Sequence, residues 1–141
     1  MATEPVVYIS YEDAVHAHIE LMRYLGETRY GVDDRGLIKS ALARPRQAAT
    51  YDEADLIAQA ATLLYGLIKN HPWKGGNKRT ATTITELFLR HNSFRITSSK
   101  NELVEMALAV EAGEWQLPQI ETWLRQHVKR VNTLAATNPD E

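Results

Sequence analysis

Apolar residues recur every three or four positions through most of this 141-residue sequence. That spacing places them on one face of an α-helix, whereas a half-buried strand alternates apolar and polar residues. The strongest such run is Ile57, Ala60, Ala61, Leu64, Leu67 and Ile68. Alternation is found in the short segment 94–97. The pattern therefore predicts an all-α fold, a compact bundle of about six helices with one very short strand pair.

Capping and helix-breaking residues set the expected limits of these helices. Ser10, followed by two acidic residues, is suited to a helix start, and Pro45 is expected to stop the second helix. The expected helices are 11–25, 37–42, 52–68, 77–89, 101–112 and 117–131. The segment 94–97 is expected to be a strand, and its expected partner is the segment 6–9.

The composition indicates one globular domain without a general attraction to polyanions. A formal charge of −2 and an isoelectric point near 6.2 do not favour binding to nucleic acid or to an anionic membrane. Cysteine is absent, and no stretch approaches the ~20 apolar residues of a membrane span. We therefore expect a cytoplasmic protein with a single domain over residues 1–132 and a disordered tail over residues 133–141.

The sequence His-Pro-Trp-Lys-Gly-Gly-Asn-Lys-Arg, at positions 71–79, lies between the expected helices 52–68 and 77–89 and is called the motif segment below. Gly75 and Gly76 let the backbone approach a ligand closely, and the helix start that follows leaves its first N–H groups unpaired. Together with the cations Lys78 and Arg79, these amides are suited to phosphate oxygens. The motif segment therefore predicts a local anion site.

His71 stands at the beginning of this segment, where an imidazole can accept a proton near neutral pH. Trp73 is the expected apolar anchor of the segment. Plainer interpretations stay open, because His71 can be a helix cap, the glycine pair a tight turn, and the two cations a solvated face. A Walker phosphate loop and a helical zinc motif do not match, since neither the G-x-x-x-x-G-K-[ST] nor the H-E-x-x-H pattern is present.

The motif segment resembles the Fic/Doc signature, H-x-F-x-[DE]-G-N-G-R in Fic proteins and H-x-F-x-[DE]-[AG]-N-K-R in the Doc branch. Lys78, in place of the second motif glycine, indicates the Doc branch. The similarity extends over roughly residues 8–130. Its other parts are the sequences at 36–45, 69–72, 80–81 and 88–92.

This resemblance implies that His71 acts as general base on a Ser or Thr hydroxyl of a target protein. It also implies that the nucleotide phosphates of ATP are held by the segment around the glycines, that is by Gly75, Gly76, Asn77, Lys78 and Arg79. Fic proteins transfer the AMP part of ATP, whereas the Doc branch transfers the terminal phosphoryl group. The implied target is elongation factor Tu, and the implied partner is a Phd-like antitoxin.

Position 75 departs from the family pattern, because a glycine stands where an Asp or Glu normally holds Mg²⁺. Three explanations remain: an inactive or altered natural member, a detoxified variant, or a metal ligand supplied from elsewhere. Asp52, Glu53 and Glu86 are the candidate substitutes. The chain is thus expected to be a growth-arresting kinase toxin. The alternatives are a nucleotidyl transferase and a pseudoenzyme that only binds.

Overall fold

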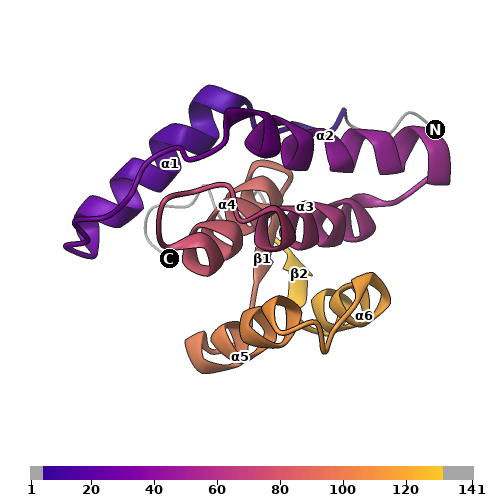
Figure 1. Cartoon of the computed structure of the whole chain (residues 1–141). Helices are drawn as coiled ribbons and strands as arrows, with labels where there is room; N and C mark the ends of the chain where they lie inside the picture. Colours follow the sequence, from indigo (N-terminus) through magenta and orange to yellow (C-terminus); the bar gives the residue numbers. More distant parts are fainter. Residues whose placement is uncertain (1–4, 132–141) are drawn as a thin grey trace, which may run out of the picture.

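The structure, a computed structural model, describes residues 5–131, which form six helices and one two-stranded sheet (Figure 1). The elements in chain order are α1 (Tyr11–Tyr24), α2 (Arg35–Asp52), α3 (Leu56–Asn70), α4 (Asn77–His91), β1 (Phe94–Ile96), α5 (Lys100–Glu111), α6 (Leu117–His127) and β2 (Val128–Arg130). Helices α3 and α4 lie in the middle, with α1 and α2 on one side and α5 and α6 on the other. The prediction of an all-α bundle is confirmed.

Helix α3 is the centre of the core, because it packs against α2, α4, α5 and α6. Leu63, Leu64, Leu67 and Ile68 are at most 2% exposed. Full burial of each such side chain stabilises the fold by about 1.5–3 kcal/mol. Because α4 is also buried along one face, the motif segment between α3 and α4 is anchored at both of its ends.

The prediction that Pro45 stops the second helix is wrong, since α2 continues through it to Asp52. A proline inside a helix removes one backbone hydrogen bond and costs about 3 kcal/mol. Here Pro45 is itself buried, and Ala41 and Ala48 on either side of it are buried as well. Packing of α2 against α3 therefore outweighs the local cost.

The third helix begins later than predicted. Its cap is Asp55, whose Oδ1 accepts a hydrogen bond from the Ala58 N–H at 2.9 Å. Asp52 is instead the last residue of α2, and Glu53 follows it with a left-handed backbone, φ 52°. Three closely spaced acidic residues offered several possible caps, and only the last one of them caps α3.

The predicted strand near residue 94 exists, but its predicted partner is wrong. β1 pairs antiparallel with β2, with Phe94 opposite Arg130 and Ile96 opposite Val128. Residues 128–130 are thus a strand and not the last turn of the predicted helix 117–131. The backbone of Val7 is bound by the side chain of Asn92 instead, which accepts from its N–H at 2.8 Å and donates to its carbonyl at 2.9 Å.

None of the helices in the described range is long and apolar enough to cross a membrane. The predicted disordered tail, residues 133–141, lies outside the described residues, as does position 132 at the expected domain boundary.

Candidate functional site

The motif segment leaves α3 at a sharp turn and enters α4 at Asn77. His71 ends α3 with a left-handed backbone, φ 51°, and Gly76 precedes α4 with φ 64°. Trp73 is only 2% exposed and stacks on the His18 ring of α1, with centroids 4.2 Å apart. The prediction that Trp73 anchors the segment in the core is confirmed.

The side chain of Asn77 organises the inside of the turn. Its Oδ1 accepts from the Trp73 N–H, and its Nδ2 donates to the Trp73 carbonyl, both at 2.9 Å. Nδ2 also lies 3.3 Å from Nδ1 of His71. Both polar atoms of this buried amide are therefore engaged by the chain. The predicted phosphate contact of Asn77 stays a prediction. Because the side chain is occupied, the group that could make this contact is the backbone N–H of Asn77.

The backbone N–H groups from Gly75 to Arg79 have no acceptor within the described part of the chain. They form the amino end of α4, where the helix dipole is positive. Arg79 and Lys74 are exposed, and neither has an ion-pair partner among the described residues. The structure thus brings unpaired amides and cations together, an arrangement that binds anionic oxygens.

His71 is accessible, with 61% of its side chain exposed. Its Nε2 lies 3.8 Å from Oε2 of Glu111, the last residue of α5. Glu111 also binds Lys78, whose Nζ lies 3.0 Å from both carboxylate oxygens. The imidazole, the ammonium group and one carboxylate therefore form a cluster at the amino end of α4.

Glu111 was missed in the sequence, because it is far from the motif in the chain and matches no local spacing. The three acidic candidates considered instead do not reach the motif segment. Asp52 and Glu53 lie at the opposite end of α3, a helix about 22 Å long. Glu86 lies about 13 Å along α4 from Asn77 and pairs with Arg90 at 3.8 Å.

A connection between α1 and α2 lies along the outer edge of the motif segment. The Lys74 N–H donates to the Gly31 carbonyl at 2.9 Å, and the N–H groups of Asp33 and Asp34 donate to the Pro72 carbonyl. Arg29 Nε donates to the Lys74 carbonyl at 2.8 Å. The connecting segment 29–34 therefore fixes the backbone of the motif segment.

At Gly75 the motif segment lies close against the backbone of the connecting segment. A Cβ added there would overlap the carbonyl oxygen of Arg29. A backbone atom cannot swing aside as the end of a side chain can, so any side chain at position 75 would push the connecting segment away. Glycine is therefore required by this packing, and the acidic residue of the family pattern does not fit.

The buried side chain of His18 binds the backbone of the connecting segment. The Gly31 N–H donates to its Nε2 at 2.9 Å, so the neutral ring carries its proton on Nδ1 and donates to Oγ1 of Thr80, 2.8 Å away. The ring is fully buried, and this burial lowers the pKa of His18 to about 4. His16, two residues earlier in the same helix, is exposed.

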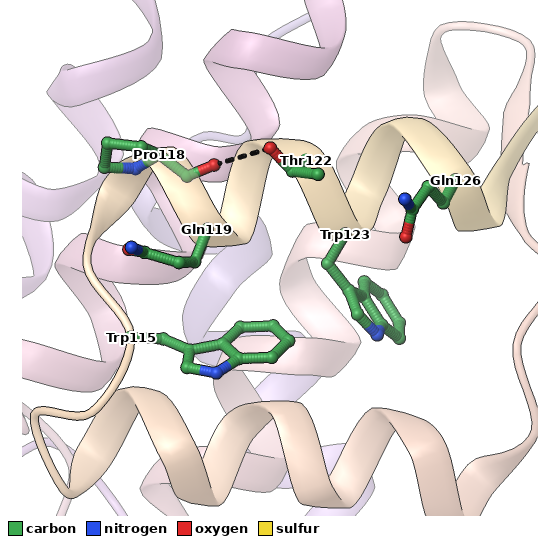
Figure 2. A pocket seen from close by; sticks show the side chains of 6 residues that line it. All are labelled: Trp115, Pro118, Gln119, Thr122, Trp123 and Gln126. Carbon is green, nitrogen blue, oxygen red and sulfur yellow. Dashed lines mark hydrogen bonds between the residues drawn. The ribbon is translucent and has the colours of Figure 1, made fainter.

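A separate hollow of about 390 Å³ lies on α6, and no residue of the motif segment lines it. Its lining residues are Trp115, Pro118, Gln119, Thr122, Trp123 and Gln126 (Figure 2). None of them is charged, so this hollow does not suit a phosphate group.

Comparison with known proteins gives consistent matches. A model of the Fic/DOC family matches residues 8–89, more than half of the chain. The chain is 30% identical over 121 residues to "Protein kinase doc" of Escherichia phage P1, which covers 84% of this chain and 94% of that protein. It is 36% identical over 94 residues to "Toxin Doc" of Mycolicibacterium smegmatis, which covers 64% of this chain and 68% of that protein.

Proposed function

Since the chain belongs to the Fic/Doc family, we propose that it is the toxin of a toxin–antitoxin pair and transfers the terminal phosphoryl group of ATP to a Ser or Thr hydroxyl of a protein. One observation carries this proposal. The exposed His71 imidazole lies beside a helix end that presents unpaired amides and two cations. A base next to an anion site is the combination that phosphoryl transfer requires.

In the proposed reaction the amides from Gly75 to Arg79, together with Lys78 and Arg79, hold the phosphates. The acceptor oxygen forms a bond to the γ-phosphorus, the bond to the β,γ-bridging oxygen breaks, and ADP leaves. The hydroxyl proton goes to Nε2 of His71. Acceptance at Nε2 requires Nδ1 to carry the ring proton, so Nδ1 gives up its long contact with Nδ2 of Asn77.

The proposed target is elongation factor Tu, the translation factor expected from the resemblance, and this target places the chain in the cytoplasm. The proposed partner is a Phd-like antitoxin. Support comes from the similarity to proteins named as a Doc toxin and a Doc kinase, one of which is matched over 94% of its length.

Mg²⁺ is the proposed cofactor of ATP, and its role would be to neutralise charge on the phosphates during transfer. Residue 75, where the family pattern has the metal-binding carboxylate, is a glycine in this chain and cannot supply one. The carbonyl oxygen of Arg29 occupies the space that a side chain at this position would need. Among the described acidic residues, Glu111 is the one whose carboxylate forms ion pairs with the motif segment. Since Mg²⁺ on a nucleotide needs only one or two carboxylates, the residues present are compatible with the ion through Glu111.

Labelled ATP tests the proposal against the transfer of AMP. The purified chain is incubated with elongation factor Tu and with ATP labelled at either the α or the γ phosphorus. Label retained by the target from the γ position alone supports phosphoryl transfer, whereas retention from the α position identifies a nucleotidyl transferase. Absence of label from both positions would leave a protein that only binds, the alternative that Gly75 favours.

The His71→Ala variant tests the role given to the imidazole. We expect an unchanged thermal unfolding midpoint, because the side chain is mostly exposed, together with loss of transfer by at least about a hundredfold. Circular dichroism checks the fold, and incorporation of label checks the activity. Transfer at the wild-type rate by the folded variant would refute this role.

A further inference from the structure

We propose that Glu111 supplies, from the end of α5, the carboxylate that binds the divalent cation of the nucleotide. It would replace the acidic residue that is absent at position 75. The inference rests on the proposed function, because it concerns ATP bound at the motif segment.

The position of Glu111 is the first support. Its carboxylate touches Lys78 and lies next to His71, the groups proposed to contact the terminal phosphate and the acceptor hydroxyl. No other carboxylate in the described range has an ion pair or a side-chain hydrogen bond with the motif segment. A metal bound to the terminal phosphates and to this carboxylate would lie where charge accumulates during transfer.

The second support is that Lys78 and Glu111 each lie at the helix end whose dipole disfavours their charge. Lys78 lies in the first turn of α4, where a cation is disfavoured, and Glu111 lies in the last turn of α5, where an anion is disfavoured. The pair is also 37% and 36% exposed, and ion pairs of this kind contribute little to stability. Stability alone therefore does not account for this arrangement, whereas a ligand that carries both phosphate and metal does.

The exchange of partners on nucleotide binding follows from the charges. A phosphate oxygen offers Lys78 an anion in place of the carboxylate, and the carboxylate is then available to a cation. The side chain can move, because it is partly exposed and lies at a helix end. Phosphate oxygens, one carboxylate and water molecules make up the ligand set that Mg²⁺ commonly takes on nucleotides.

The experiment measures ATP affinity with Mg²⁺ and with a chelator by isothermal titration, in wild type and two variants. Glu111→Gln removes the carboxylate. Glu114→Gln makes the same change of charge at an exposed site three residues further along. In wild type and Glu114→Gln we expect Mg²⁺ to tighten ATP binding by about tenfold, a coupling typical of two ligands that share a site. In Glu111→Gln this gain should be lost. Circular dichroism verifies that all three proteins are folded.

Several results would overturn the inference. If Glu111→Gln keeps the full gain from Mg²⁺, the carboxylate is not a metal ligand. If this variant binds ATP more tightly in both conditions with an unchanged ratio, Glu111 is only a competing anion. If wild type binds ATP without any gain from Mg²⁺, the metal role fails while the proposed function stands. If wild type binds no ATP at all, the proposed function fails, and the metal role fails with it.

Discussion

The buried imidazole of His18 should make the stability of the fold depend on pH in mildly acidic solution. Its two nitrogens join Gly31 of the connecting segment to Thr80 of α4, and its ring stacks on Trp73. Protonation would put a charge into this buried site and would leave Nε2 with a proton facing the Gly31 N–H. The neutral ring is therefore the form that the folded chain holds.

The size of the effect follows from the pKa of this group in the folded and the unfolded chain. Burial lowers the pKa to about 4, whereas the ordinary value for a histidine, which the unfolded chain retains, is 6.5. Well above pH 6.5 the ring is neutral in the folded and in the unfolded chain, so His18 does not reduce the free energy of unfolding there. As the pH falls below 6.5, the unfolded chain binds a proton that the folded chain does not, and the free energy of unfolding decreases. Between about pH 7.5 and pH 4.5 the expected loss is about 2–3 kcal/mol.

Urea unfolding at the two pH values measures this loss, with His18→Gln and His16→Gln as the variants. Glutamine does not titrate in this range, and His16 is an exposed histidine on the same helix. We expect His18→Gln to lose about 2–3 kcal/mol less than wild type on acidification, and His16→Gln to behave as wild type does. Asp55, whose pKa is lowered by its hydrogen bond to Arg125, titrates equally in all three proteins. Equal losses in wild type and His18→Gln would refute the reasoning.

Two further predictions concern packing. Gly75→Ala should destabilise the chain by about 1–3 kcal/mol, because its Cβ overlaps the Arg29 carbonyl, whereas Gly36→Ala in the first turn of α2 should not. Thermal unfolding of both variants checks this, and equal midpoints would contradict it. Asn92→Ala should cost about 1–3 kcal/mol, because its side chain binds both Val7 backbone groups and the Phe88 carbonyl. Urea unfolding measures this cost, and a loss below about 0.5 kcal/mol would show that the contacts contribute little.

The helices were predictable from local spacing, because the apolar face of a helix is visible within a few turns. The limits of these helices were less predictable. Pro45 is an effective helix breaker locally, but burial on both sides of it depends on α3, which the local sequence does not show. The prediction that β1 pairs with segment 6–9 was wrong for a similar reason. Segments 6–9 and 128–130 are both short, and only tertiary packing selects between them.

The motif segment was predictable because its glycines and cations are consecutive. What surrounds it was not predictable. His18 and Glu111 come from helices far from it in the chain, and each reads locally as an ordinary helical residue. An acidic residue in the last turn of α5 was a weak signal, because it opposes the helix dipole. The need for glycine at position 75 also depends on a backbone contact with Arg29 that no sequence pattern encodes.

The connecting segment 29–34 has a consequence for ligand affinity. Gly31, Asp33 and Asp34 hold the backbone of Pro72 and Lys74 by hydrogen bonds. The unpaired amides that follow, from Gly75 to Arg79, therefore keep their direction without a ligand. A preorganised receptor of this kind loses little conformational entropy on binding, so more of the interaction energy remains as affinity. The length and sequence of this surface connection would thereby tune how tightly the amides at the amino end of α4 could hold an anion.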